Sequence, residues 1–391
     1  MLIEFTVKNY KSIKDTLTLS MLPSKRIKSK DRLNNLINVP NYPNLYLLKG
    51  AVLYGANNSG KSNILESLYV LKQLINDTLD LDDLDKYVNS ISFDFDNQNN
   101  HEIELTIDFI AEDGLRYNYK ILFNTYCIIN ETLSYYPPNR KIQKLKLIYN
   151  RIEKFGKVFV KGLNKKYYQN LESNKLLLSK TNTNNISFLI PVYNFFNSIT
   201  KFEFKNEIKN NILNESCINY IINMMRIIDP NIKSLEINNE NLSLFYNRIT
   251  LIYRQFSGKK ELNIPYKIKL SSMSNGSIKL FRLSYLIYKS INSNQFLIID
   301  DIDKELHSDL TSYLIKELHN TQNNSQFLLI SHDVTQMNNF DKDQVYIVEK
   351  DYYGITTCSS VSEFNGLHKK MTLENWYRQG RLGGIPHIKN T

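Results

Sequence analysis

Residues 51–68 read AVLYGANNSGKSNILESL, and the centre of this stretch decides the fold. Residues 55–62 fit the pattern G-x-x-x-x-G-K-[ST], which is typical of loops that bind the phosphates of a nucleoside triphosphate. An apolar run over 44–55 predicts a core strand before the loop, and apolar residues over 62–76 recur at helical spacing after it. The loop therefore lies between a predicted strand and a predicted helix, as this pattern requires.

Each residue type in this loop has a physical role. Gly55 and Gly60 permit backbone angles that turn amide groups inward, where they and the positive end of the following helix cradle phosphates. Lys61 is expected to reach the β- and γ-phosphates, and the Ser62 hydroxyl to hold Mg²⁺. The predicted cofactors are therefore ATP and Mg²⁺. The predicted ATP-binding residues are Gly55, Ala56, Asn57, Asn58, Ser59, Gly60, Lys61, Ser62 and Asn63.

A triphosphate site also needs an acidic metal partner at the end of a neighbouring strand. FLIID at residues 296–300 supplies four apolar residues followed by Asp300, which we expect to hold Mg²⁺ directly or through water. Asp301 follows immediately, and a carboxylate at this point can orient or deprotonate the attacking water. Alone, this pair would be a strand end with solvated acids. Together with a phosphate loop, it predicts a hydrolytic site in which Asp301 is catalytic.

Two further stretches narrow the class. SMSNGSIKLF at residues 272–281 opens a predicted helix, and a serine and a glycine before a helix N-terminus favour an anion site. One chain needs only one phosphate loop, so we interpret Ser274, Asn275 and Gly276 as a cap on the γ-phosphate of another subunit; an ordinary helix cap is the alternative. FLLISHD at 327–333 ends a predicted strand with His332, which is placed either to contact the γ-phosphate and the attacking water or to serve a structural role.

Size and composition bound the remaining classes. The 391 residues suffice for one large or two ordinary domains, and a hydrophobic content of 42% permits a sizeable core. Three widely spaced cysteines, Cys127, Cys217 and Cys358, indicate neither a disulfide framework nor a cysteine zinc site. The charged, alternating first fifteen residues are unlike a signal peptide, and no apolar run is long enough to cross a bilayer. We expect a cytoplasmic protein that does not contact membranes.

The formal net charge of +10 is unevenly distributed. Residues 139–180 hold twelve Lys and Arg against two Glu, a balance of +10, whereas residues 75–115 hold twelve Asp and Glu against one Lys, a balance of −11. The basic block also contains Tyr149, Phe155, Phe159, Tyr167 and Tyr168. Such a block is compatible with a polyanion site, with two surfaces that face each other, and with plain solvation.

Patterns along the chain predict a three-part organisation. Alternating segments at 102–110, 116–124 and 126–136 predict antiparallel strands, and strand–helix–strand patterns return after residue 277. The intervening chain is rich in Asn and Lys, mixed in type and without sustained heptads. We therefore predict an N-lobe with the phosphate loop at 1–138, a mixed insertion at 139–264, and a C-lobe with the acidic strand end, the serine–glycine stretch and the histidine at 265–391.

The order of these motifs resembles the ABC-type ATPase heads of the SMC, Rad50 and OLD groups. It is most similar to the small bacterial AAA-family ATP-binding proteins, which include RloA-like proteins, abortive-infection ATPases and the ATPase subunits of the anti-phage systems PARIS (AriA) and Septu (PtuA). The matching stretches include FTVKNYKSIKD (5–15), YGANNSGKSNILESL (54–68), LIIDDIDKELHSDL (297–310), LLISHD (328–333) and NWYRQGRLGGIPHI (375–388). The expected fold is an α/β head of the ABC/SMC type with antiparallel N-lobe strands, a mixed α+β insertion and no long coiled coil.

The resemblance implies a homo-oligomer in which two heads sandwich two ATP molecules. Ser274 and Gly276 would contact the partner's nucleotide, His332 would be a switch histidine, and the segment around Asn9 and Lys11 would lie near the nucleotide. The group usually has Glu after the metal-binding Asp, whereas this chain has Asp301. A shorter carboxylate lies farther from the water, which favours a slow ATPase or an ATP-held switch.

Two functions remain open at this point, with a transporter subunit as a poorer third. The first is a sensor or scaffold of an anti-phage system that controls a separate effector, a nuclease or toxin. The second is an ATPase that engages DNA or RNA through the basic block, with Lys161, Lys165 and Lys166 as its contact residues. The absence of long coiled-coil arms counts against the second.

Overall fold

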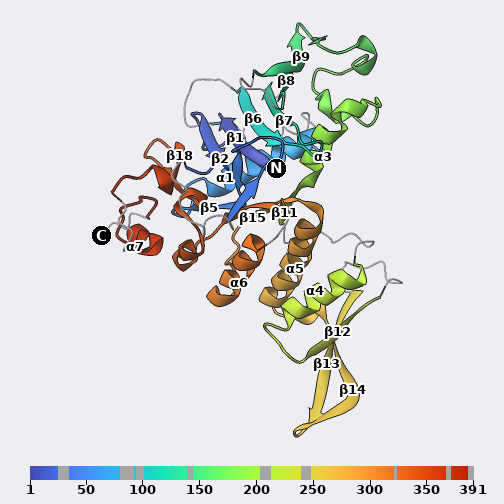
Figure 1. Cartoon of the computed structure of the whole chain (residues 1–391), viewed down its shortest axis with the longest axis vertical. Helices are drawn as coiled ribbons and strands as arrows, with labels where there is room; N and C mark the ends of the chain where they lie inside the picture. Colours follow the sequence, from blue (N-terminus) through green and yellow to red (C-terminus); the bar gives the residue numbers. More distant parts are fainter. Residues whose placement is uncertain are drawn as a thin grey trace.

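The computed structural model shows two stacked sheets with helices around them and a projecting three-stranded appendage (Figure 1). The residues that the structure describes are 1–24, 35–79, 92–93, 101–124, 126–138, 144–202, 213–238, 248–320, 324–366 and 371–385. Parts of the predicted loop at 25–35, of the predicted helix at 206–228, of the strand pattern at 233–246 and of the stretch 375–388 lie outside these ranges.

A mostly parallel six-stranded sheet carries the predicted core strands. Its order is β11-β15-β16-β5-β17-β18, and all neighbours pair in parallel except β17 and β18, which are antiparallel. The strands are β5 (Gly50–Tyr54), β11 (Ile199–Phe202), β15 (Phe296–Ile299), β16 (Gln326–Ile330), β17 (Val345–Lys350) and β18 (Thr356–Ser360). The strand predictions around 44–55, 295–300, 326–331 and 343–350 are confirmed.

Both faces of the central strands β5, β15 and β16 are buried, which explains why these strands read as continuous apolar runs. Along β5, Ala51 and Leu53 belong to the hydrophobic core on the N-lobe side, whereas Val52 and Tyr54 belong to the core on the opposite side. All four side chains are at most 1% exposed. The alternation follows from the two-residue period of a strand, and it fixes β5 between two separate cores.

The helices divide between these two cores. Helix α1 packs with the N-lobe, and α5 and α6 cover the other face of the parallel sheet (Figure 1). The helices are α1 (Lys61–Ile75), α3 (Ile190–Ser198), α4 (Glu215–Met225), α5 (Asn275–Ser293), α6 (Ser308–His319) and α7 (Leu373–Arg378). The short 3₁₀ helices are η2 (Lys165–Tyr167), η3 (Leu178–Lys180), η4 (Ser187–Leu189), η6 (Leu270–Ser272), η7 (Val334–Asn339), η8 (Lys342–Gln344) and η9 (Val361–Glu363).

The N-lobe is a seven-stranded antiparallel sheet of order β10-β9-β8-β7-β6-β1-β2. Two of its strands, β9 and β10, come from the stretch that the sequence pattern left as a mixed insertion, so the expected boundary at 138/139 falls inside the sheet. The strands are β1 (Leu2–Lys8), β2 (Leu17–Ser20), β6 (Ile103–Ile110), β7 (Arg116–Phe123), β8 (Ile128–Tyr136), β9 (Lys146–Lys154) and β10 (Lys157–Lys161). A two-stranded sheet of β3 (Leu36–Asn38) and β4 (Tyr46–Leu48) lies beside it.

A buried polar cluster fastens the chain after β10 to this sheet. The Glu131 carboxylate accepts hydrogen bonds from the Tyr149 hydroxyl at 2.7 Å, from the Tyr119 hydroxyl at 2.9 Å and from the amide of Leu177 at 2.7 Å. Glu131 and Tyr149 are fully buried. Tyr149 was grouped with the aromatic residues of the basic block, but its ring lies in the interior and is not available to stack on a nucleic acid.

The appendage is an antiparallel sheet of β12 (Ile232–Ile237), β13 (Ile249–Ser257) and β14 (Lys260–Lys269), against which α4 packs. It projects from the end of the molecule that carries α5 (Figure 1). Among the described residues the longest helix is α5, with 19 residues. The predicted fold class, an α/β head with antiparallel N-lobe strands, a mixed insertion and no long coiled coil in the described ranges, is confirmed.

A search of the described helices for a membrane span gives a negative result. None of them combines the length and the apolar character that crossing a bilayer requires.

His319 at the end of α6 makes the fold sensitive to acid. Its Nδ1 donates to the carbonyl oxygen of Ile315 at 3.1 Å, and its Nε2 accepts from the side-chain amide of Gln344 at 3.1 Å, which in turn donates to the carbonyl oxygen of Gly50. Burial lowers the pKa of His319 to about 4. Between these two pKa values, 6.5 in the unfolded chain and about 4 in the folded chain, the unfolded chain binds a proton and the folded chain does not. The contribution of His319 to stability is therefore full above pH 6.5 and falls as the pH drops toward 4.

We predict that this single histidine removes about 2 kcal/mol of unfolding free energy between pH 7.5 and pH 5. Urea unfolding of the native chain and of His319→Gln at both pH values measures the effect. The variant lacks the titrating group, so its pH-dependent loss should be smaller by that amount even if it is less stable at both pH values. Equal pH dependence in the two proteins would contradict the assignment.

Candidate functional site

The phosphate loop joins β5 to α1, and Lys61 is folded into it. Lys61 is 5% exposed, and its Nζ donates to the carbonyl oxygens of Gly55 at 2.9 Å and Ala56 at 2.8 Å. Gly60, the residue before α1, has a φ of 103°, which favours glycine over other residues. The loop therefore holds its ammonium group at its own centre, where the β- and γ-phosphates of a nucleotide are expected.

Residues distant in sequence hold this loop from outside. A Cβ atom on Gly60 would lie 2.2 Å from the Thr356 Oγ1, so only glycine fits beside β18. The Thr356 hydroxyl lies 2.8 Å from the carbonyl oxygen of Ser59 and 2.7 Å from the Ser12 hydroxyl. On the other side, the Asn63 side-chain amide donates to the Ser12 hydroxyl at 2.6 Å. Ser12 and Thr356 thus clamp the loop between the N-lobe and the sheet.

The segment around Asn9 and Lys11 lies beside the first turns of α1. Lys11 Nζ forms an ion pair with the Glu66 carboxylate at 2.6 Å, and the Asn9 side-chain amide donates to the carbonyl oxygen of Glu102 at 2.9 Å. Both residues have positive φ angles, 57° for Asn9 and 49° for Lys11. This tight turn brings the neighbouring Ser12 to the phosphate loop, so the segment flanks the predicted nucleotide position.

The predicted metal ligands lie together. Asp300 follows β15, and burial raises the pKa of its carboxyl group, while a hydrogen bond from Ser62 acts against that rise. The Oδ1 of Asp300 is buried, and none of the described residues forms a hydrogen bond with it. A buried carboxylate oxygen without a partner is costly unless a cation completes it.

The donor set at this point fits Mg²⁺. Mg²⁺ usually takes one or two carboxylates, keeps several waters and shares the phosphate oxygens of a nucleotide. Ser62 and Asp300 offer one hydroxyl and one carboxylate of this kind. Among the described residues no group of three or more His, Cys, Asp or Glu side chains could hold a metal by itself.

Asp301 and His332 form the next pair. The Asp301 Oδ1 lies 3.2 Å from the His332 Nε2, and both side chains are about two-fifths exposed, at 39% and 41%. Asp301 adopts a φ of 51°, in the left-handed region that Asn and Asp enter more often than other residues besides Gly. The pair places a carboxylate and an imidazole in contact at the edge where β15 and β16 end.

Electrostatics connect the phosphate loop with residues 300–305, which follow β15 and are called the acidic loop below. Burial lowers the pKa of Lys61, and the carboxylates of Asp301 and Asp300 act in the opposite direction. Both carboxylates therefore lie close enough to the Lys61 ammonium group for their charges to act on it. Asp300 is the predicted metal ligand, and Asp301 is the predicted partner of the attacking water. The structure therefore brings together the predicted residues of three loops that are separated by up to 277 positions in the sequence, from Gly55 to His332.

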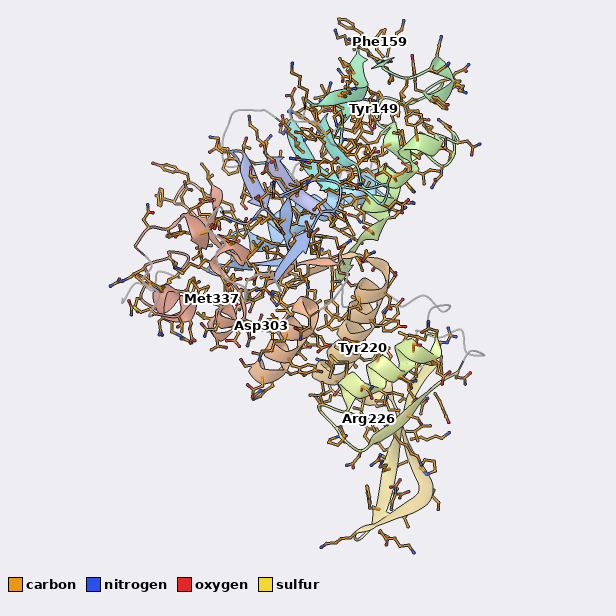
Figure 2. All side chains as sticks on the ribbon, viewed as in Figure 1. Tyr149, Phe159, Tyr220, Arg226, Asp303 and Met337 are labelled. Carbon is orange, nitrogen blue, oxygen red and sulfur yellow. The ribbon has the colours of Figure 1, made fainter. Side chains whose placement is uncertain are left out.

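Asp303, which the sequence patterns did not single out, holds residues 331–333 in place. These residues follow β16, carry His332 and are called the histidine loop below. Its carboxylate accepts hydrogen bonds from the amide of His332 at 3.1 Å and from the amide of Asp333 at 3.1 Å. The side chain, labelled in Figure 2, therefore ties the acidic loop after β15 to the loop after β16. The only sequence signal was its place in the acidic run LIIDDIDKELHSDL, where solvation was an equally good explanation.

Asp333 continues this connection to the start of α6. Burial raises its pKa, but hydrogen bonds from Gln336, Ser308 and Thr335 outweigh that effect and lower the pKa of Asp333 to about 2. The two shortest of these bonds, from the Ser308 and Thr335 hydroxyls, are each 2.6 Å. The carboxylate is therefore occupied with structural partners and is not a second general base.

The serine–glycine stretch opens α5, as predicted. The Ser274 hydroxyl caps this helix by accepting from the amide of Ser277 at 3.3 Å, and both Ser274 and Asn275 are exposed. Gly276 lies against the acidic loop, because a Cβ atom there would come within 2.6 Å of the Glu305 carbonyl oxygen. Within one chain, the helix start therefore packs against the acidic loop and leaves its exposed end free for another molecule.

Lys279 is a second residue that the sequence patterns missed. It lies one turn into α5, is 3% exposed, and donates through Nζ to the carbonyl oxygens of Asp301 at 2.6 Å and Lys304 at 2.7 Å. Burial lowers its pKa to about 8, and the neighbouring carboxylates of Asp303 and Asp301 oppose this shift. Its ammonium group thus holds the acidic loop in its turn and joins that loop to the helix that begins with Ser274.

The residues predicted for nucleic acid lie elsewhere. Lys161 ends β10, and Lys165 and Lys166 belong to the short helix η2. All three side chains are exposed. They belong to the outer part of the N-lobe, and none is a described partner of the phosphate loop.

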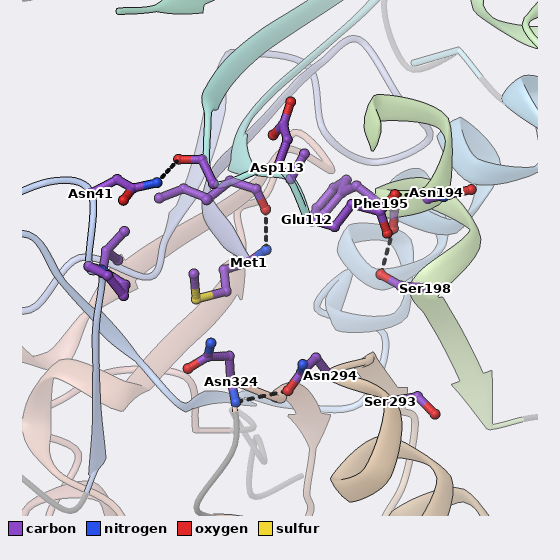
Figure 3. Close-up of a pocket in the computed structure, with 15 residues that line it drawn as sticks. Met1, Asn41, Glu112, Asp113, Asn194, Phe195, Ser198, Ser293, Asn294 and Asn324 are labelled. Atoms are coloured by element: carbon purple, nitrogen blue, oxygen red, sulfur yellow. Dashed lines mark hydrogen bonds between the residues drawn. The ribbon is translucent and has the colours of Figure 1, made fainter. Parts of the chain in front are cut away.

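A pocket of about 510 Å³ lies away from the predicted site, between the start of β1, α3 and the end of α5 (Figure 3). Asn294 and Asn324, which line it, precede β15 and β16, whereas Asp300 and His332 follow these strands. Because β15 and β16 are parallel, the residues that precede them and the residues that follow them lie at opposite ends of these strands. The pocket contains no residue of the phosphate loop and carries no part of the candidate site.

A phosphate loop between a parallel strand and a helix, with an aspartate at the end of a neighbouring strand, defines a P-loop protein of the ATPase class. The chain belongs to the family described as "AAA domain, putative AbiEii toxin, Type IV TA system", whose model matches residues 51–338. No curated protein sequence matches the chain.

Three solved head structures are similar to this chain at low identity. The SMC head domain from Thermotoga maritima is 14% identical with a TM-score of 0.45, over 92% of this chain and 98% of that chain. An SMC head bound to the C-winged helix domain of ScpA is 14% identical with a TM-score of 0.49, over 96% and 99%. An SMC head with an extended coiled coil, bound to the C-terminal domain of ScpA from Pyrococcus furiosus, is 13% identical with a TM-score of 0.47, over 97% and 98%.

We predict that Lys279→Met loosens the acidic loop. The methionine keeps the bulk of the side chain but leaves two carbonyl oxygens without their donor, which costs roughly 2 kcal/mol. Hydrogen exchange at the amides of residues 301–305 should accelerate at least tenfold, and urea unfolding should show the loss of stability.

Lys304→Met is the matched control. It removes a lysine charge from the same loop, but its side chain is exposed and its carbonyl oxygen still accepts from Lys279. Exchange at residues 301–305 that is as slow in Lys279→Met as in this control would show that Lys279 does not hold the loop.

Proposed function

We propose that this chain is an ATP-binding, slowly ATP-hydrolysing subunit that assembles through nucleotide held between two heads and controls a separate effector in bacterial anti-phage defence. The observation that carries the nucleotide part is the meeting of Ser62 and Asp300 at the phosphate loop, beside the pair formed by Asp301 and His332. These groups come from three loops, and Lys279 and Asp303 hold two of those loops in the positions that bring the groups together.

The phosphate loop and its metal partners bind the substrate. The backbone amides of residues 55–63 and the amino end of α1 receive the phosphates, and Lys61 neutralises them. Ser62 and the unpartnered oxygen of Asp300 would hold Mg²⁺, which neutralises charge on the phosphate oxygens when it is bound.

Asp301 and His332 act on the water. The Asp301 carboxylate orients the attacking water or accepts its proton, and His332, at 3.2 Å, fixes the direction of that carboxylate. Because aspartate is one methylene shorter than glutamate and its carboxylate is already engaged with His332, alignment with the water is imperfect. Hydrolysis is therefore slow, and bound ATP persists long enough to hold an assembly together.

Ser274, Asn275 and Gly276 complete the site of a second subunit. The amino end of the 19-residue helix α5 carries partial positive charge and exposed polar side chains, which suit a γ-phosphate. Lys279 connects this end to the acidic loop, so contact with a partner's nucleotide reaches Asp301 through the hydrogen bond from Lys279 to the Asp301 carbonyl oxygen.

The family description supports a connection with a toxin–antitoxin system and applies the word toxin to the matched domain itself, whereas the separate effector is our proposal. It names a toxin and a type IV toxin–antitoxin system, and such systems pair a harmful activity with a protein that restrains it. An assembly of heads held together by ATP can switch such restraint off, because the assembly separates and releases the effector when ATP is lost or hydrolysed. The effector is a nuclease or a toxin.

We predict that Mg²⁺ and ATP convert the single head into an assembly of at least twice its mass, and that Ser274→Asp prevents this. Aspartate caps a helix as well as serine does but repels a γ-phosphate. Light scattering measures the mass, and calorimetry should show that the variant binds ATP within about threefold of the native chain. ATP itself should maintain the assembly for many minutes, because hydrolysis is slow.

Two controls bracket this experiment. Ser274→Asn keeps the cap without the charge and should assemble normally, whereas Lys61→Ala should lose ATP binding at least a hundredfold and remain single. Gly276 is a poor target, since any side chain there collides with the Glu305 carbonyl oxygen of its own chain. Assembly by Ser274→Asp would refute the role in a second subunit's site, and absence of any co-purifying effector from its native cells would refute the control of a partner.

A nucleic-acid function is the second candidate, and the exposed face of β9 and β10 favours it. The cross-strand pairs Lys157–Lys154, Phe159–Ile152 and Lys161–Asn150 share one face of the sheet. Phe159 is 56% exposed and lies at the outer end of the N-lobe, unlike Tyr149 (Figure 2). Lysines around an exposed aromatic ring suit backbone contact and base stacking.

The triple variant Lys161→Glu, Lys165→Glu and Lys166→Glu tests this candidate. Its affinity for a single-stranded DNA or RNA oligonucleotide at low salt should fall at least tenfold, as measured by fluorescence anisotropy. Lys259→Glu, Lys260→Glu and Lys269→Glu on the appendage form a control of equal charge change, because all three side chains are exposed. Equal losses in both triple variants, or no binding by the native chain at low salt, would exclude this face.

A further inference from the structure

The turn between β17 and β18 stands against the phosphate loop on the side away from Asp300. Lys350, the last residue of β17, reaches the side-chain oxygen of Asn58 with its Nζ at 3.5 Å. Thr356, the first residue of β18, contacts the carbonyl oxygen of Ser59. Both ends of the turn at residues 351–354 are therefore attached to the loop that receives the phosphates.

Hydrogen bonds close this turn and fix its shape. The carbonyl oxygen of Asp351 accepts from the amide of Gly354 at 3.1 Å, and the Asp351 carboxylate accepts from the amide of Ile355 at 2.8 Å. Gly354 has a φ of 80°, which lets the chain enter β18. The two central positions, Tyr352 and Tyr353, are consequently held outward on a well-defined support.

Neither tyrosine contributes to the fold. Tyr352 is 98% exposed and Tyr353 is 72% exposed, and neither belongs to a hydrophobic core. Turn centres favour Gly, Pro, Asn, Asp and Ser, whose side chains support the turn, so two aromatic residues bring no local advantage. Their rings contact each other edge to face, with centroids 5.7 Å apart and an interplanar angle of 85°, which leaves ring faces open to solvent.

We propose that Tyr352 and Tyr353 form a stacking platform for the base of the nucleoside triphosphate whose phosphates the loop holds. The inference rests on the proposed nucleotide function and adds the part of the ligand that the phosphate loop does not recognise. A nucleotide bound by its phosphates places a flat aromatic base beside the loop, and the exposed rings stand on the turn whose two ends, Lys350 and Thr356, contact Asn58 and Ser59.

The platform also sets the specificity. Every base has a π-face, and stacking discriminates weakly among bases, whereas hydrogen bonds to base edges discriminate strongly. Of the polar groups in the turn, the Asp351 carboxylate is already engaged with the amide of Ile355. The platform therefore accepts any nucleoside triphosphate by stacking, and ATP and GTP bind with affinities within a few fold of each other.

The test compares a ligand that has a base with one that does not. Calorimetry with Mg²⁺ measures the binding of ATP and of inorganic tripolyphosphate to the full native chain and to the double variant Tyr352→Ala and Tyr353→Ala. The double variant should bind ATP about tenfold more weakly and tripolyphosphate as well as the native chain does. Tyr352→Phe with Tyr353→Phe keeps the rings and should restore ATP binding. Tyr126→Ala, at a tyrosine that is 78% exposed elsewhere, should change neither ligand.

The outcomes separate this proposal from the proposed function. Unchanged ATP affinity in the alanine variant overturns the platform while leaving the phosphate loop intact. Unchanged ATP affinity together with loss of ATP-dependent assembly also overturns it and assigns the tyrosines to the contact between subunits. Loss of both ligands in the alanine variant overturns it as well, because the turn would then support the phosphate loop itself. If the native chain binds neither ligand, the nucleotide function fails, and the platform fails with it.

Discussion

The parallel pairing of β5, β15 and β16, with both of their faces buried, is the constraint on which the rest of the structure depends. Residues of these strands alternate between two apolar cores, so a shift of one position would exchange the two sets of side chains. The register that pairs Ile299 with Leu329 and Ile330 with Leu53 is thereby fixed. Since parallel strands end at one edge, Asp300, His332 and Gly55 emerge beside each other, and the chemistry of the site follows from the packing of the sheet.

The sheet fixes the positions of the strand ends but not the conformations of the loops that follow them. Two buried or half-buried charged side chains hold these loops in place. Lys279 holds the backbone of the acidic loop from α5, and Asp303 holds the backbone of the histidine loop from the acidic loop. The helix that begins with Ser274, the carboxylate of Asp301 and the imidazole of His332 are in consequence one hydrogen-bonded unit. Any movement of α5 that accompanies assembly must change the position of Asp301.

The phosphate loop shows the same division between local pattern and distant support. Its glycines, lysine and serine could be read directly because their spacing is local. The reason that Gly60 must be glycine, in contrast, is the hydroxyl of Thr356, nearly 300 positions later in the chain.

The strands β9 and β10 were missed for a related reason. Their polar, lysine-rich alternation resembles a solvated insertion, and only pairing with β8 makes them part of the N-lobe.

The sequence by itself determined the phosphate loop, the strands and helices on either side of it, the acidic pair after β15, the histidine after β16 and the serine–glycine start of α5, because each is a short pattern whose meaning depends on neighbours within a few residues. The tertiary structure alone decided that Ser62 meets Asp300, that Lys279 and Asp303 bind the loops into one unit, that Tyr149 is interior, and that the turn carrying Tyr352 and Tyr353 stands beside Asn58. These contacts join residues far apart in the chain, and the buried sheet, whose register no local pattern specifies, is what brings them together.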